Sequence, residues 1–232
     1  MKRIAAVLLV LVASVGSVTS AQAIDCVGVD GADADTPHVV DFTSDWVGNL
    51  SERPRSGTYP GGDVWREGTD ITQGWIARGE DGRLRAYIQV VELLGIEQNA
   101  VFYFRWSYTG STPAQSKRWV SVRLKAYGSS FSYGFITTSI TGGTLYSTVG
   151  DTTGTVIPGR PGTLVMDFPT GEGTADWGQP APGSTLDEPL ALSFFSRGSP
   201  EQLPPNPTGL RYGFIDLADD TADGDFCETI DI

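Results

Sequence analysis

Histidine is almost absent from this chain of 232 residues, which contains His38 alone together with only two cysteines. A zinc site built from several histidine or cysteine ligands is therefore excluded by composition. A Ser–His–Asp triad would have to use His38, and no Gly-x-Ser-x-Gly motif accompanies it. We expect this histidine to lie in a surface loop.

Long hydrophobic runs are absent as well. The longest, residues 4–12, follows two basic residues and is too short to cross a bilayer. It leads to an Ala-Gln-Ala motif at 21–23, which is typical of the cleavage site of a secretion signal. We therefore expect residues 1–23 to be a signal peptide, the mature protein to be secreted, and no segment to span a membrane.

Basic residues are few, with 16 lysines and arginines against 28 acidic residues and a formal charge of −12. Removal of the signal peptide takes away two basic residues, which leaves 14 against 28 and a charge of −14. Nucleic acid and anionic lipid are therefore not expected as partners, because phosphate contacts require a basic surface. The negative charge favours solubility and the binding of divalent cations.

The two cysteines, Cys26 and Cys227, stand near the two ends of the mature chain. Secretion would expose them to oxidising conditions, in which two lone cysteines most simply pair with each other. Such a bond would close a loop of about 200 residues and stabilise the fold by roughly 5 kcal/mol in the chain-entropy description. We expect a structural bond rather than a redox site, because no Cys-x-x-Cys motif is present.

Apolar and polar residues alternate with a period of two through much of the chain after residue 69. Leu84, Ala86, Ile88 and Val90 show the pattern, which is typical of half-buried antiparallel strands. Turn signals separate about eight to ten such strands, expected at 84–90, 102–107, 119–127, 131–138, 143–149, 153–157, 163–168, 190–195 and 210–217. The sequence therefore predicts an all-β fold, a single antiparallel β-sandwich of jelly-roll-like type.

Proline and glycine mark the irregular parts of the chain. They interrupt residues 24–62, which we expect to be an irregular segment packed on a β-sandwich domain of residues 63–232. Within that segment, residues 39–46 could add one edge strand. Two long loops rich in proline and glycine are expected at 170–189 and 197–209.

The central strands carry several basic and aromatic residues at the positions that alternate with the core. Aromatic rings stack on the apolar faces of sugars, and arginine donates hydrogen bonds to hydroxyls and carboxylates. A glycan-binding sheet face, suited to an acidic polysaccharide, is one interpretation, and simple cross-strand packing of an exposed or covered face is the other. The predicted ligand-binding residues are Arg85, Tyr87, Tyr103, Arg105, Trp119, Arg123 and Tyr127, with Lys125 on the same face.

Acidic residues surround both cysteines, with Asp30, Asp33 and Asp35 close to the first. A disulfide would bring the two acidic stretches near each other, which is repulsive unless a cation relieves it. A structural Ca²⁺ is the ion that several carboxylates favour, although no EF-hand spacing is present, and solvated loops are the alternative. The ligands to test first are Asp219, Asp220, Asp223 and Asp225.

A glycoside hydrolase needs only two carboxylates, so composition does not exclude one. The Glu-x-Asp-x-x-Glu pattern of jelly-roll glucanases is absent. The remaining candidates, Glu92, Asp167 and Asp176, are scattered, and Asp167 is expected to point to solvent from a strand. Catalysis is therefore the weakest of the functional interpretations.

Four stretches between residues 70 and 169 carry a family resemblance: DITQGWI at 70–76, LRAYIQV at 84–90, RWVSV at 118–122 and GTLVMD at 162–167. They resemble the DOMON-like and family-9 carbohydrate-binding-like sandwiches of exported bacterial, especially actinobacterial, proteins. The resemblance covers about half of the mature chain and implies sugar binding or, in some DOMON members, haem held by a methionine and a histidine. Met166 and His38 are the only such residues after the initiator, and we expect Met166 to pack in the core.

Taken together, these features predict a secreted, non-catalytic β-sandwich that recognises an extracellular carbohydrate or cell-envelope component. A structural or interaction protein of the envelope is the first alternative, and a hydrolase is the second.

Overall fold

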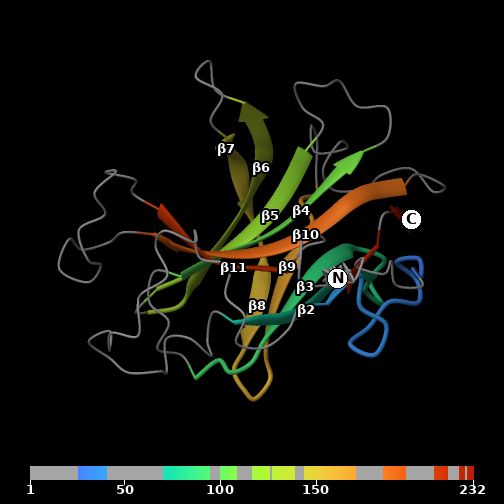
Figure 1. The fold of residues 1–232 in the computed structure, drawn as a ribbon, viewed down its shortest axis with the longest axis horizontal. Coiled ribbons are helices and arrows are strands. Elements are labelled where there is room, and N and C mark those ends of the chain that lie inside the picture. The colour runs from blue at the N-terminus through green and yellow to red at the C-terminus, as the bar shows by residue number, and fades with distance from the viewer. Residues whose placement is uncertain are drawn as a thin grey trace, which may run out of the picture.

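The structure, a computed structural model, describes residues 26–40, 70–94, 100–108, 117–125, 127–138, 144–170, 185–196, 212–218, 225–227 and 229–232. These residues form two antiparallel β-sheets that face each other as a β-sandwich, and they contain no helix. The all-β prediction is confirmed, and the jelly-roll connectivity stays a prediction. Figure 1 shows the second sheet, with β4, β5 and β10, lying across the first, with β2, β3 and β9.

The first sheet contains six described strands in the order β12-β1-β2-β3-β9-β8. Its strands are β1 (Val39–Val40), β2 (Ile71–Arg78), β3 (Leu84–Val90), β8 (Gly154–Ile157), β9 (Gly162–Asp167) and β12 (Asp225–Phe226). Of the strand predicted at 39–46, Val39–Val40 are present as β1 and residues 41–46 lie outside the described residues; β1 pairs with both β2 and β12 and is not an edge strand. A C-terminal strand therefore covers the edge that the N-terminal segment was expected to form.

The second sheet contains seven described strands, six of them in the order β11-β10-β4-β5-β6-β7 with β13 paired to β10. Its strands are β4 (Ala100–Tyr108), β5 (Lys117–Leu124), β6 (Ser129–Thr138), β7 (Thr144–Thr152), β10 (Thr185–Ser196), β11 (Tyr212–Ala218) and β13 (Thr229–Asp231). The first five residues of β10 fall within the loop predicted at 170–189, because the start of this strand pairs with β13. The loop predicted at 197–209 lies outside the described residues.

A tight turn fixes the register of β2 against β3. The amide of Gly82 donates to the carbonyl of Gly79, and Gly82 has a φ of 77°, which glycine adopts without strain. The turn sets Arg78 opposite Leu84 and, farther along the strands, Gln73 opposite Gln89. The register therefore follows directly from the position of the turn.

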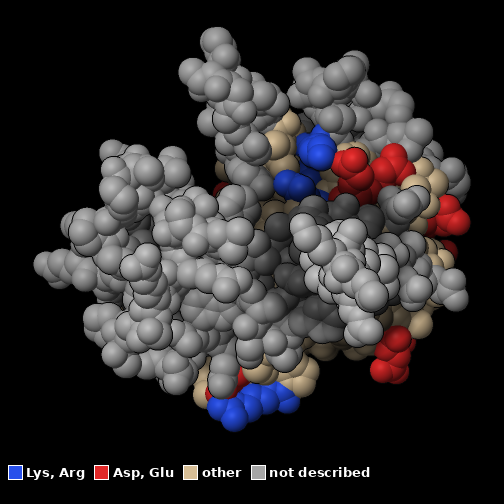
Figure 2. Space-filling view, in the orientation of Figure 1, with Lys and Arg blue, Asp and Glu red and all other residues tan. Residues whose placement is uncertain are grey.

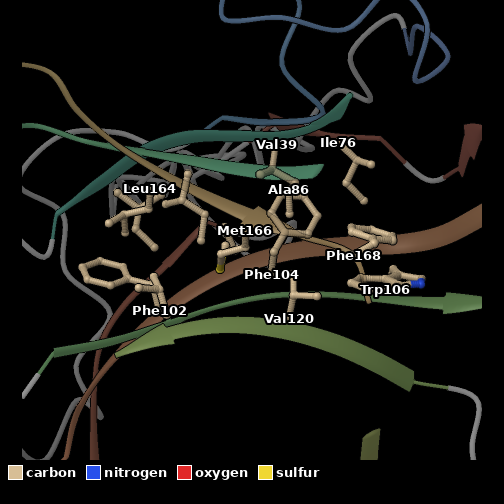
Figure 3. Close-up of a cluster of buried hydrophobic side chains, with 14 of the residues drawn as sticks. Val39, Ile76, Ala86, Phe102, Phe104, Trp106, Val120, Leu164, Met166 and Phe168 are labelled. Atoms are coloured by element: carbon tan, nitrogen blue, oxygen red, sulfur yellow. The ribbon is translucent and has the colours of Figure 1, made fainter. Parts of the chain in front are cut away.

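The core lies between the sheets and is built from alternate residues of the strands (Figure 3). Leu84, Ala86, Ile88 and Val90 of β3 are all fully buried, as the alternation predicts. Met166 is also fully buried, so its predicted core position is confirmed. Ring stacking contributes as well, since the Trp106 and Phe168 centroids are 4.4 Å apart with planes inclined by 9°.

The N-terminal segment, residues 26–40, is fastened to the sandwich at several points and lies beside β2 (Figure 1, blue). The predicted disulfide between Cys26 and Cys227 is present, with a Cα–Cα distance of 5.5 Å. The Val29 amide donates to the carbonyl of Asp231, and the Val29 carbonyl accepts from the Arg78 amide. The segment is therefore held both to the C-terminal strand β13 and to β2.

Candidate functional site

The predicted basic and aromatic residues do not share one face. β3 belongs to the first sheet, whereas β4 and β5 belong to the second, so the residues divide between two outer faces of the sandwich. The expectation of a single face is therefore wrong, because alternation tells which side of a strand a residue is on but not which sheet the strand joins. Arg85 and Tyr87 lie on one outer face, and Tyr103, Arg105, Trp119 and Arg123 lie on the other.

The outer face of the second sheet is closed at its centre. Trp119 is only 1% exposed: it sits over Gly134, where an added Cβ would approach its ring to 2.6 Å, and meets Tyr103 edge-to-face at 5.1 Å. Leu190 and Leu192, which pack with Tyr103, are also buried. Trp119 therefore offers no open ring for a sugar, contrary to the expected ligand-binding role.

Tyr127 is not on a strand, contrary to the predicted strand 119–127. β5 ends at Leu124, and the Lys125 amide donates to the carbonyl of Gly128, which has a φ of 92° and closes a turn. The Tyr127 side chain is 98% exposed in this turn. Because its ring has no aromatic or polar neighbours arranged around it in the described part of the chain, it makes a useful control position.

The outer face of the first sheet presents a row of aromatic, amide and hydroxyl side chains, which we call the Tyr87 face. Trp75 and Tyr87 are cross-strand partners whose rings stack with centroids 5.0 Å apart and planes inclined by 1°. Trp75 is 6% exposed, whereas Tyr87 is partly exposed, so the buried Trp75 ring packs against the more exposed Tyr87 ring. The face consists of Gln73, Trp75, Ala77, Arg85, Tyr87, Gln89, Thr155, Ile157, Thr163, Val165 and Asp167.

Two glutamines on this face are oriented by a backbone carbonyl. Nε2 of Gln73 donates to the Ala34 carbonyl at 2.9 Å and to Oε1 of Gln89 at 2.8 Å. A carbonyl can only accept, so the Ala34 contact determines which end of the Gln73 amide carries nitrogen, and this in turn orients Gln89. The alternation predicted neither glutamine as a site residue, although the turn at Gly82 places them opposite each other.

Arg85 is held between two carboxylates. Its Nη2 lies 2.6 Å from Asp81 Oδ2, and its Nε lies 2.8 Å from Asp167 Oδ1. The other oxygen of Asp167, Oδ2, accepts a hydrogen bond from the Thr153 hydroxyl. The bond to Asp167, followed by that to Asp81, raises the pKa of Arg85. The pKa of Asp81 is lowered first by the Arg83 amide and then by Arg85. The charge of Arg85 is thus already matched within the protein.

Some other described cations also lie next to carboxylates, and Figure 2 shows blue and red atoms side by side near the top of the view. Lys117 Nζ is 2.9 Å from Glu188 Oε2 on the second sheet. Lys117, with a smaller contribution from Arg105, lowers the pKa of Glu188. Arg123 is exposed near the end of β5. Arg85 and Lys117 thus both have carboxylate partners within the described part of the chain.

His38 is buried, and the predicted surface loop is wrong. Its Nδ1 accepts from the Ile76 amide at 2.9 Å, and its Nε2 donates to the Val27 carbonyl at 2.9 Å. Burial lowers the pKa of His38 to about 4, and the bond to Val27 opposes this only in part. Both ring nitrogens are occupied by backbone groups, so the imidazole joins the N-terminal segment to β2 and is not presented to a cofactor or substrate.

The calcium prediction falls largely outside the part of the chain that the structure describes, because positions Asp219, Asp220 and Asp223 are not among its residues. Asp225 lies in β12, opposite Val40. Within the described residues, no group of three or more His, Cys, Asp or Glu side chains is placed to hold a metal ion.

Two of the acidic residues after Cys26, Asp30 and Asp33, have local partners instead of a common centre. Oδ1 of Asp33 accepts hydrogen bonds from the Asp35 amide at 2.8 Å and from both the amide and hydroxyl of Thr36 at 3.0 Å. The Asp35 amide first and the Thr36 hydroxyl second lower the pKa of Asp33. Asp30 pairs with Arg78 at 2.8 Å. These carboxylates are therefore explained by a turn and an ion pair.

The scattered carboxylates do not form a glycosidase pair among the described residues. Asp167 lies opposite Arg85 near the start of β3, whereas Glu92 follows the end of that strand and pairs with Arg160. Seven residues of extended chain separate Arg85 from Glu92, or ~23 Å, which far exceeds the ~5–10 Å between catalytic carboxylates. Asp176 lies outside the described residues.

Comparison of the chain with family models, curated proteins and solved structures yields no match. The resemblance to DOMON-like and family-9 carbohydrate-binding-like sandwiches thus stays a prediction. Among the described residues, no helix is long and apolar enough to cross a membrane.

Proposed function

We propose that the protein is an exported, non-catalytic β-sandwich that recognises an extracellular carbohydrate or a carbohydrate component of the cell envelope. The proposed binding surface is the Tyr87 face. The observation that carries this proposal is the partly exposed Tyr87 ring, which stacks on Trp75 in a row of neutral amide and hydroxyl groups.

The chemistry of this face suits a sugar. The C–H face of a pyranose ring packs on an aromatic ring, as other apolar groups do, and its hydroxyls both donate and accept hydrogen bonds. Tyr87 supplies the ring, while Gln73, Gln89 and Thr163 supply donors and acceptors on three adjacent strands. Because strands rather than loops carry these groups, their spacing is set by the sheet and little ordering is needed on binding.

Export supports an extracellular ligand. The signal-peptide pattern at 1–23, the Cys26–Cys227 disulfide and the negative charge are all consistent with a protein that works outside the cell.

The test compares Tyr87→Ala with Tyr127→Ala, which removes an equally large ring from an exposed turn of the other sheet. Binding of the purified protein to a panel of soluble and insoluble polysaccharides would be measured by depletion and by affinity electrophoresis. We expect Tyr87→Ala to weaken glycan binding by about fivefold, the equivalent of one aromatic contact of about 1 kcal/mol. Tyr127→Ala should bind as the parent does.

Failure of the parent to bind any glycan would overturn the proposal. Association with purified envelope material without glycan specificity would then favour the structural or interaction role. Equal losses in the two tyrosine variants would show that a glycan binds somewhere other than the Tyr87 face.

A further inference from the structure

We propose that the ligand of the Tyr87 face is a neutral, hydroxyl-rich polysaccharide and not an acidic one. The inference rests on the proposed function and adds the class of ligand. It follows from two features of the face: the ion pairs that Arg85 forms with two carboxylates, and the fixed orientation of the two glutamines.

Among the described residues of the Tyr87 face, Arg85 is the only lysine or arginine, and two carboxylates already hold it. Asp81 also lies 3.9 Å from Arg83, so the two carboxylates and the two arginines together carry no net charge. A uronate or sulfate group bonded to the remaining N–H donors of Arg85 would bring a further negative charge close to Asp81 and Asp167, or would have to displace one of them. Asp167, whose side chain is only 15% exposed, would then keep a charge without its cation. The face therefore selects against anionic ligands.

The glutamine pair presents one acceptor and one donor group to a ligand. Gln73 uses both of its amide hydrogens, one on the Ala34 carbonyl and one on Gln89 Oε1. Its own Oε1 and the Nε2 of Gln89 make no hydrogen bond to a described residue. A sugar hydroxyl can donate to the first of these atoms and accept from the second, or two neighbouring hydroxyls can share them.

A carboxylate would be a poor match for this pair. It could accept from Gln89 Nε2 but would face Gln73 Oε1, which is also an acceptor. Gln73 cannot turn its amide over to help, because nitrogen must face the Ala34 carbonyl. A hydroxyl meets both requirements without any rearrangement, so the glutamines select for the same ligand class as the charge of Arg85 does.

The Tyr87 ring lies directly beside this pair. Gln89 follows Tyr87 by two residues on the same side of β3, and Thr163 lies opposite Gln89 on β9. From Arg85 to Gln89 the face is ~13 Å long, which accommodates more than one sugar ring of a chain. A polysaccharide lying along β3 would thus stack on Tyr87 and bond to the glutamines with adjacent units.

The experiment measures retention of the purified protein by affinity electrophoresis in gels that contain either a neutral polysaccharide or a polyuronate. A panel of neutral glucans, xylans and mannans would be compared with polygalacturonate and alginate, each at low and high NaCl. We expect retention by at least one neutral polymer and none by the polyuronates. Retention should be unchanged from about 0.01 to about 1 M salt, over which the Debye length falls from ~30 to ~3 Å.

Two substitutions test the glutamine pair. Gln89→Leu keeps the size of the side chain but removes its donors, and it should weaken neutral binding by about fivefold. Gln73→Glu replaces the amide, which donates to Ala34 and Gln89, by a carboxylate that can only accept. The Nε2 of Gln89 would then turn toward this carboxylate and no longer donate to the ligand, so we expect a similar loss of neutral binding. Arg123→Ala, on the other sheet, is the matched control and should bind as the parent does. Thermal melting of each variant checks that the fold is intact.

The outcomes separate this inference from the proposed function. Salt-sensitive retention by polyuronates alone would overturn the neutral class while leaving carbohydrate recognition standing. Neutral retention that is insensitive to Gln89→Leu and Gln73→Glu would overturn the role of the glutamines. No retention by any polymer would overturn the proposed function, and the inference with it.

Discussion

Acidification should destabilise the protein through His38 well before its carboxylates are protonated. In the folded state the imidazole is buried, and its Nδ1 accepts a hydrogen bond from the Ile76 amide. Protonation would place a hydrogen on Nδ1 against that amide hydrogen, so two donors would face each other. The folded protein therefore resists protonation, and the pKa of His38 falls from 6.5 to about 4.

The size of the effect follows from linkage. Because the folded pKa lies below the unfolded pKa, the unfolded chain takes up a proton first as the pH falls. Stability is therefore complete above about pH 6.5 and declines as the pH falls toward 4. The loss reaches about 2 kcal/mol at pH 5 and about 3 kcal/mol at pH 4, where it begins to level off.

The assay is urea unfolding followed by tryptophan fluorescence at several pH values, for the parent and for His38→Asn. Asparagine can accept a hydrogen bond from the Ile76 amide but does not titrate, so carboxylate contributions cancel in the difference between the two proteins. We expect the parent to lose about 2 kcal/mol more than the variant between about pH 8 and pH 5. An NMR titration adds a direct readout, because the chain has one histidine.

Parallel loss of stability in the two proteins would refute this reasoning. So would a ring titration with a midpoint near 6.5, because it would mean that the imidazole is accessible to protons in the folded state.

Three further predictions concern the fold. Cys26→Ser with Cys227→Ser should lower the free energy of unfolding by about 3–5 kcal/mol in urea titrations, because the bond closes a loop with a sequence separation of 201; an unchanged midpoint would contradict this. Trp106→Ala should cost about 3–5 kcal/mol, since the ring is 1% exposed and stacks on Phe168, and a loss below about 1 kcal/mol would show that the site is loosely packed. Arg85→Ala should cost about 1–2 kcal/mol, with a smaller loss in high salt, because two carboxylates lose their shared cation; salt-independent loss would favour packing by the side chain instead.

The fold could be predicted from local patterns because the strands are half buried. β3 shows this directly: its buried and partly exposed residues alternate without exception, as its sequence does. The disulfide was predictable too, since the only two cysteines of the chain have one possible pairing with each other. These features depend on neighbouring residues or on composition, both of which a sequence displays.

The candidate site was harder to predict because it depends on which strands share a sheet. Trp119 and Tyr87 both alternate with core residues along their strands. Trp119 is nevertheless buried over Gly134, whereas Tyr87 is partly exposed on the outer face of the other sheet. His38 shows the same limit, because a polar residue in an irregular segment gives no local sign that backbone groups from two elements will surround it. Counting back from the turn at Gly82 would have paired Gln73 with Gln89, and this was the available signal for the site.

The N-terminal segment links the stability of the fold to the proposed specificity. Cys26 and His38 fasten its two ends, the first to Cys227 and the second to β2, and between them the Ala34 carbonyl reaches Gln73. The group that orients the glutamines is thus the backbone carbonyl of Ala34, which every type of residue carries. The side chain at this position therefore gives no sign of a function. Its position depends instead on the two fastenings, because a segment released at either end would gain conformational entropy and the carbonyl would no longer hold the amide in one orientation. The bonds that close the fold would therefore also fix which atoms the Tyr87 face offers to a ligand.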